Sequence, residues 1–171
     1  FAISLTGEST AYPKLWEVIA ELNLRGYTSF LVTNGQLPEV LARIPLPTQL
    51  YISVSAPNEQ LFNAVGKPMR KDGWQRLLKS LDLLQQLRKG GKTRAVIRLT
   101  LIKGVTMLPK YAEQFAAMIK RGNPLFVECK SYMWVGSSRE KLEKCNMASH
   151  SGIREFAASV GKKCGYRIVD E

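Results

Sequence analysis

Polar side chains follow the first three short apolar runs of the sequence. Gly7 and Glu8 come after the first run, Asn34 comes after the second, and the third run ends on Ser53 and Ser55. A polar group inside an apolar strand must be hydrogen-bonded or face a wet cavity. Reactive groups of α/β proteins gather at the C-terminal ends of the strands. The pattern therefore predicts one shared site.

The fourth and fifth apolar runs carry polar residues at five positions: Arg98, Thr100, Lys103, Glu128 and Lys130. A buried guanidinium needs an anion, and Glu128 or Glu8 could be the structural partner of Arg98. Lys103 and Lys130 stand where a Schiff-base amine could form, although most lysines at strand ends are simply solvated.

Some of these residues also have a purely structural explanation. Gly7 and Glu8 could form an ordinary turn, and Asn34 lies in a Thr-Asn-Gly tripeptide that is common in turns. The sole histidine, His150, begins a helical pattern, which favours a role at the helix start over catalysis.

A long stretch without periodicity, residues 131–149, contains Tyr132 and Trp134. Loops of this length are usually functional or mobile. Basic residues follow the third and fifth runs: Lys67, Arg70, Lys71, Arg139, Lys141 and Lys144. Aromatic rings beside cations suit base stacking and phosphate contacts, so this end of the sheet is a candidate RNA-binding face.

These side chains are positioned by an alternation of strand and helix patterns. Strand-like runs occupy residues 1–6, 27–33, 49–55, 94–102, 125–130 and 166–169, and helical spacings separate them. This order predicts an α/β fold with a parallel sheet, either open or closed as a (β/α) barrel. No boundary is visible, so residues 1–171 are expected to form a single domain.

Composition narrows the class of protein. The 171 residues carry 25 Lys and Arg against 14 Asp and Glu, a net charge of +11, and 45% are hydrophobic. The hydrophobic content predicts a packed core, and the positive net charge favours a polyanionic partner. No apolar run is long enough to span a membrane. Three cysteines with no CxxC spacing predict neither a disulfide framework nor a metal site, and favour a cytoplasmic protein. Because Phe1 already lies in a strand pattern, we expect a piece of a longer protein.

Residues 2–13, AISLTGESTAYP, resemble the AISLxGEPTLYP segment of a family of radical-SAM enzymes, the tRNA 4-demethylwyosine synthases. Further matches run in order along the chain: residues 30–34 (FLVTN), 48–54 (TQLYISV), 74–76 (WQR), 98–103 (RLTLIK), 127–130 (VECK), 149–150 (SH) and 153–156 (IREF). The resemblance covers nearly the whole chain, and its ordered series is more specific than any one motif.

The resemblance implies a partial (β/α) barrel that holds S-adenosylmethionine and a 4Fe–4S cluster. The reduced cluster releases a 5′-deoxyadenosyl radical, which abstracts hydrogen from the methyl group of N1-methylguanosine in phenylalanine tRNA. Condensation with pyruvate then closes the third ring of 4-demethylwyosine. The partners implied are the anticodon arm of the tRNA, pyruvate and an electron donor such as a flavodoxin-type domain.

The same resemblance implies roles for individual residues. Gly7, Glu8 and Asn34 match positions that hold the methionine end of the cofactor, and Ser53 and Ser55 match positions that meet its ribose or carboxylate. Arg98 is assigned to the cofactor as well. Residues assigned to the substrate side are Thr100, Lys103, Lys130, Tyr132 and Trp134.

Three departures from the family pattern bear on activity. Ser9 replaces a proline, and Ser55 replaces an aspartate, which removes a charge. The CxxxCxxC cluster motif is absent, and the family places it, with the second-cluster cysteines and the pyruvate-capturing lysine, before the position of Phe1. The barrel is therefore expected to lack its first strand and cluster loop, and the chain alone to be inactive. A truncated form explains this best, and a degenerate paralogue is the second explanation.

Two alternatives belong to other functional classes. A Schiff-base lyase on the same scaffold would use Lys103 or Lys130, and borohydride with pyruvate would label one of them. A non-catalytic tRNA-binding module would bind tRNA in a salt-sensitive way without any cofactor.

Overall fold

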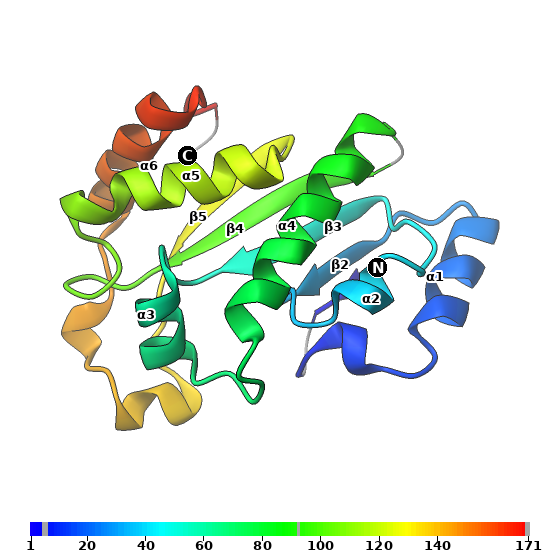
Figure 1. The fold of residues 1–171 in the computed structure, drawn as a ribbon, viewed down its shortest axis with the longest axis horizontal. Helices are drawn as coiled ribbons and strands as arrows, with labels where there is room; N and C mark the ends of the chain where they lie inside the picture. The colour runs from blue at the N-terminus through cyan, green and yellow to red at the C-terminus, as the bar shows by residue number, and fades with distance from the viewer. Residues whose placement is uncertain (5–6, 92, 170–171) are drawn as a thin grey trace. The chain divides into compact units, whose positions relative to one another are not determined.

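A computed structural model describes residues 1–4, 7–91 and 93–169 (Figure 1). Five strands form one sheet in the order β1-β2-β3-β4-β5: β1 (Ala2–Ile3), β2 (Phe30–Thr33), β3 (Gln49–Val54), β4 (Arg94–Leu101) and β5 (Phe126–Ser131). β1 pairs in parallel with β2, and β2 pairs in parallel with β3. The predicted α/β fold with a parallel sheet is confirmed.

The strand order decides between the two parallel architectures that the sequence left open. A doubly wound sheet reverses its order at a switch point, whereas here the strands follow chain order from β1 to β5. Single winding of this kind is the arrangement of a partial (β/α) barrel.

Helices connect the strands, as the periodicity predicted (Figure 1). They are α1 (Leu15–Leu24), α2 (Pro38–Leu41), α3 (Glu59–Leu61), α4 (Gly73–Lys89), α5 (Ala112–Gly122) and α6 (His150–Cys164). Among the described residues, every helix is too short or too polar to cross a bilayer.

The first of two compact units contains residues 1–53, 68–97 and 121–127. Its core is built from the apolar stripe of α4, where Leu77, Leu81 and Leu84 recur at one-face spacing and are fully buried. Leu50 and Ile52 of β3 are buried as well, because alternate residues of a strand share one face. α2 lies beside α4 in this unit (Figure 1).

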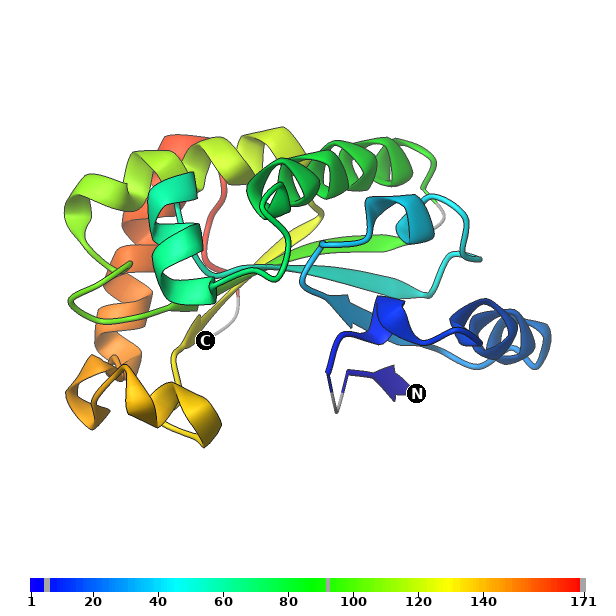
Figure 2. The ribbon, with the colours of Figure 1, turned by 60° about the horizontal axis from the view of Figure 1, so that its bottom comes forward.

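The second unit contains residues 54–67, 98–120 and 128–171. Within it α5 and α6 lie side by side (Figures 1 and 2), joined by an edge-to-face contact of Phe115 with Phe156 at 6.0 Å between ring centroids. Ser149 caps α6 by accepting a hydrogen bond from the Gly152 amide. The prediction that residues 1–171 form a single domain stays a prediction.

Two expected strands differ from the structure. The first is described only at Ala2–Ile3, and its predicted continuation through Leu5 and Thr6 lies outside the described residues. The strand predicted at residues 166–169 is wrong, because these residues adopt no regular structure. The Tyr166 amide instead donates to the Gly161 carbonyl at the end of α6, and Val169 is exposed.

We expect Gly161→Ala to destabilise the protein. A Cβ at this position would lie 2.5 Å from the backbone oxygen of Tyr166, which cannot move without breaking the end of α6. Overpacking of this kind costs about 1–3 kcal/mol, to be measured by urea unfolding. Gly152→Ala in the same helix is the comparison: its Cβ would meet only side-chain atoms, Ser149 Oγ at 3.3 Å and Met107 Cε at 3.4 Å, and alanine is favoured over glycine in a helix by about 1 kcal/mol, so no loss of stability is expected. Equal effects of the two substitutions would contradict the packing argument.

Candidate functional site

The carboxylate of Glu8 ties the turn after β1 to the end of β2. Its Oε1 accepts hydrogen bonds from the amide and hydroxyl of Thr10, at 3.0 and 2.5 Å, and from the Thr33 hydroxyl at 2.6 Å. Its Oε2 accepts a hydrogen bond from the backbone amide of Asn34 at 2.8 Å. Hydrogen bonds to an ionised acceptor are the strong ones, so this carboxylate holds the two segments together. Oε2 retains acceptor capacity for a further donor.

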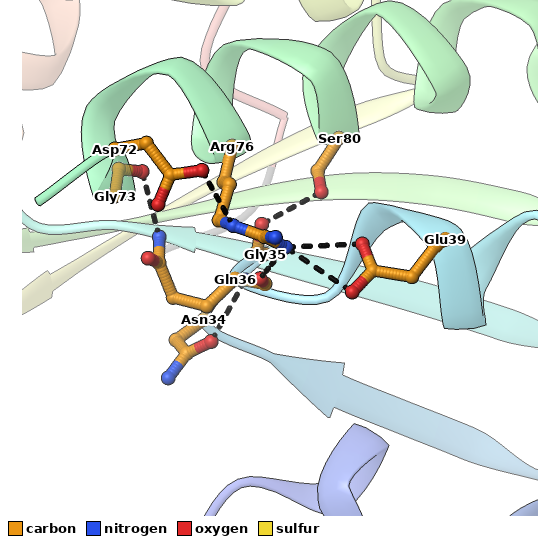
Figure 3. Close-up of polar contacts among 8 residues, drawn as sticks. All are labelled: Asn34, Gly35, Gln36, Glu39, Asp72, Gly73, Arg76 and Ser80. Atoms are coloured by element: carbon orange, nitrogen blue, oxygen red, sulfur yellow. Dashed lines mark hydrogen bonds and ion pairs between the residues drawn. The ribbon is translucent and has the colours of Figure 1, made fainter. Parts of the chain in front are cut away.

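The turn at Asn34 has a specific backbone conformation. Gly35 has a φ of 72°, in the left-handed region, and a Cβ there would lie 3.1 Å from Cδ1 of Leu77, so glycine is required. The Asn34 side-chain oxygen accepts from the Gln36 amide at 3.0 Å. Figure 3 shows the amide nitrogen of Asn34 directed away from α4. The exposed Asn34 side chain can therefore donate to a ligand.

Three other predicted cofactor-binding residues belong to this region: Gly7 follows β1, Ser53 lies in β3, and Ser55 follows β3. Gly7 has a φ of 71°, which suits a turn that brings backbone close to a ligand. Ser53 and Ser55 are half-buried, whereas Val54 between them is buried. By the period of two, both serines are on the opposite side of the chain from Val54.

Arg98 is held by an acidic residue of the neighbouring strand. Its Nε donates to Oε2 of Glu128 at 2.6 Å, and Nζ of Lys130 lies 3.9 Å from Oε1 of the same carboxylate. Of the two carboxylates considered from the sequence, Glu128 is the partner that the structure shows. Thr100 is half-buried between the buried Leu99 and Leu101, in the same alternation as Arg98.

Asn146 fixes the backbone at Lys103. The Lys103 amide donates to the Asn146 carbonyl at 2.9 Å, and the Asn146 side chain donates back to the Lys103 carbonyl at 2.9 Å. The same side chain accepts from the Glu143 amide at 2.8 Å. The lysine side chain itself is exposed. Sequence reasoning missed Asn146, because nothing in the pattern around it indicates a partner 43 residues away.

The loop after β5 carries the two aromatic residues predicted on the substrate side, Tyr132 and Trp134, and they differ in exposure. Tyr132 is buried, and its hydroxyl donates to Ser138, so the structure shows it anchoring the loop. Trp134 is exposed, its indole donates to the Leu142 carbonyl, and the Arg139 guanidinium lies 4.9 Å from the ring centroid. Trp134 with Arg139 is thus the accessible aromatic–cationic pair.

Thr33 and Thr10 hold the candidate site residue Glu8, and sequence reasoning did not include them among the site residues. Both are buried, and both hydroxyls donate to Glu8. A signal existed for Thr33, because it shares the buried face of β2 with Leu31, and a buried hydroxyl needs a partner.

Comparison with known proteins decides the family. The profile of the radical SAM superfamily matches residues 1–119, and that of wyosine base formation matches residues 121–171. The chain belongs to the radical SAM superfamily. Within it, the resemblance to the tRNA 4-demethylwyosine synthase family is confirmed by curated and solved relatives.

The relatives match this radical SAM chain along its length. The S-adenosyl-L-methionine-dependent tRNA 4-demethylwyosine synthase of Pyrococcus horikoshii is 46% identical over 99% of the chain and 49% of the relative. A structure of TYW1 with a lysine–pyruvate adduct bound is 36% identical, with a TM-score of 0.84 over 99% of this chain and 52% of that one. The crystal structure of archaeal TYW1 is 33% identical, with a TM-score of 0.79 and the same coverages. The chain thus spans about half the length of these relatives.

Membership of the radical SAM superfamily implies S-adenosylmethionine and a 4Fe–4S cluster, and the residues present fit only the first. Glu8 and Asn34 offer an acceptor and a donor, as a methionine end requires. The cysteines do not suit a cluster: no metal-ligand group of three His, Cys, Asp or Glu residues occurs in the described part of the chain. Burial raises the pKa of the Cys129 thiol to about 11, and the pKa values of Cys145 and Cys164 are also raised.

We expect these three cysteines to contribute nothing to iron binding. After anaerobic reconstitution with iron and sulfide, the triple variant C129S/C145S/C164S should hold the same iron per chain as the parent, measured by colorimetric assay and visible absorbance. A cluster absorbance that the parent shows and the triple variant lacks would overturn this assignment.

Proposed function

We propose that this chain is the cofactor-binding portion of a tRNA 4-demethylwyosine synthase. Two features support it: the successive matches to the radical SAM and wyosine profiles, and a 46% identical relative with this activity. The observation that carries it is the Glu8 carboxylate, whose Oε2 holds the Asn34 amide and can still accept a ligand cation. The whole protein would form 4-demethylwyosine from N1-methylguanosine of phenylalanine tRNA and pyruvate.

The cofactor supplies a 5′-deoxyadenosyl group when it is bound and reduced. Glu8 accepts hydrogen bonds from the ammonium of its methionine end, and the side-chain amide of Asn34 lines the same site. Ser53 and Ser55 hydrogen-bond its ribose or carboxylate, with a weaker hold at Ser55 than an aspartate would give. Gly7 lets the backbone approach closely.

Residues of the second unit are assigned to the cofactor and to the substrates. Glu128 orients Arg98 through the 2.6 Å ion pair, and Arg98 is proposed to act on the cofactor side. Thr100, Lys103 and Lys130 are proposed to meet the pyruvate carboxylate or the tRNA. A flavodoxin-type electron donor and a cytoplasmic setting complete the proposal.

We expect Glu8→Gln to weaken binding of S-adenosylmethionine. The glutamine side chain lacks the negative charge that attracts the ammonium. Both oxygens of Glu8 accept hydrogen bonds, so in either orientation the glutamine NH₂ would face a group that donates to Glu8 in the parent. Losing a hydrogen bond to a charged group corresponds to roughly a 10- to 100-fold rise in Kd, measured by calorimetry. Glu21→Gln, which removes an exposed carboxylate paired with Arg25, is the control and should leave Kd unchanged. Equal affinity of the Glu8 variant and the parent would remove this site from the proposal.

We expect Trp134→Ala to weaken binding of the phenylalanine tRNA anticodon arm. Stacking of a base on an aromatic ring contributes enough for roughly a tenfold loss of affinity. Trp134→Phe keeps a ring and should retain most of the affinity, and Trp16→Ala, on the exposed side of α1, should have no effect. Fluorescence anisotropy at fixed salt measures all three, and a loss shared by Trp16→Ala would point to non-specific binding.

A further inference from the structure

Helix α4 holds the carbonyl side of the turn that follows β2 (Figure 3). The Gln36 side chain donates to the Gly73 carbonyl at 3.0 Å, Arg76 NH1 donates to the Gln36 carbonyl at 3.0 Å, and the Ser80 hydroxyl donates to the Gly35 carbonyl at 2.7 Å. Positions 73, 76 and 80 lie on one face of a helix. One rigid face of α4 therefore contacts two consecutive residues of the turn.

Arg76 is itself held on both sides. Its Nε donates to Asp72 at 3.0 Å, and its NH1 reaches both oxygens of Glu39 at 3.2 and 3.0 Å. Its side chain is 17% exposed, and the hydrogen bond with Glu39 raises its pKa. Hydrogen bonds from its own backbone amide and from Arg76 lower the pKa of Glu39, so the pair is charged at neutral pH. A planar guanidinium spans these acceptors together, as a lysine ammonium does not.

The opposite side of the same turn carries the amides that face Glu8. The Asn34 amide donates to Glu8 at 2.8 Å, and the Gly35 amide donates to the Thr33 hydroxyl at 3.1 Å. The turn is thus clamped between α4, which bonds its carbonyl oxygens, and Glu8 with Thr33, which bond its amides. Gly35 fits because a Cβ would come within 3.3 Å of Ser80 Cβ and 3.1 Å of Leu77.

We infer that Arg76 and Ser80 are positioning residues for the methionine end of S-adenosylmethionine. The inference rests on the proposed function, in which Glu8 and Asn34 bind that end. Neither positioning residue touches the ligand in this proposal; they keep the turn in one conformation before binding. Ordering a loop in advance lowers the entropic cost of binding, so loosening it raises Kd.

The chain offers a matched control in an ion pair between α4 and α5. Arg121 of α5 makes a two-bond ion pair with Asp82 of α4, at 2.6 and 2.7 Å, and neither residue is bonded to the turn. Arg76→Gln and Arg121→Gln therefore each remove a guanidinium that is ion-paired to an acidic residue of α4, and only the first loosens the turn. Ser80→Ala provides a second variant, because it leaves the Gly35 carbonyl without its helix-side donor.

The experiment measures Kd by calorimetry for two ligands, S-adenosylmethionine and 5′-methylthioadenosine, which lacks the amino-acid end. Arg76→Gln and Ser80→Ala should weaken binding of the first ligand by roughly 5- to 20-fold, the range typical of changes that act through an intervening loop. Binding of 5′-methylthioadenosine should stay within twofold, as should both affinities of Arg121→Gln. Hydrogen exchange at residues 34–36 should become faster in the two test variants only.

The outcomes separate this inference from the proposal on which it rests. If Glu8→Gln leaves the affinity for S-adenosylmethionine unchanged, the proposed function fails and the inference fails with it. If Glu8→Gln weakens binding but Arg76→Gln and Ser80→Ala behave like Arg121→Gln, the inference alone is overturned. An equal loss for both ligands in the Arg76 and Ser80 variants would show general damage to the fold and would also overturn it.

Discussion

The carboxylate of Glu8 is the interaction on which the candidate site depends. Four hydrogen bonds converge on it from Thr10, Thr33 and Asn34, so segments that are 25 residues apart share one anion. In the described residues β1 pairs with β2 at Ala2–Phe30 and Ile3–Leu31, and the Glu8 carboxylate adds a side-chain cross-link at the end of β2. In the proposed function, a carboxylate that builds the turn and still presents an oxygen would couple the local fold directly to ligand binding.

Helix α4 gives that turn a rigid support. Its apolar face is buried at Leu77, Leu81 and Leu84, while the face that begins at Gly73 carries hydrogen-bonding groups to the turn. Hydrophobic packing thus sets where the helix lies, and polar contacts transmit that position to Asn34. A core helix of this kind is a better reference than a loop, because packed interiors resist small displacements.

The second unit shows a different division of roles. Glu128 neutralises Arg98 and lies near Lys130, and Asn146 fixes the backbone at Lys103, so the candidate substrate residues are held by partners on other segments. In the loop after β5, the buried Tyr132 supports the loop through its hydrogen bond to Ser138. Trp134 is exposed and has the Arg139 guanidinium over its ring. In the described part of the chain, no three His, Cys, Asp or Glu residues gather as a metal site would require.

The alternation of strand and helix patterns was sufficient to predict the parallel α/β sheet, because a period of two or 3.6 residues is a local property. The start of a helix at His150 was predictable for the same reason. A buried guanidinium needs an anion, so an acidic partner of Arg98 was also predictable, although the choice between Glu8 and Glu128 was not. The role of Arg76, the burial of Tyr132 and the link from Asn146 to Lys103 were not, since each depends on a partner that only the winding of the chain supplies. The run at 166–169 has strand composition, yet a strand needs a neighbour with free backbone groups, and its first amide bonds the end of α6 instead. Composition and spacing therefore determined which elements form, and tertiary hydrogen bonds decided which side chains they bring together.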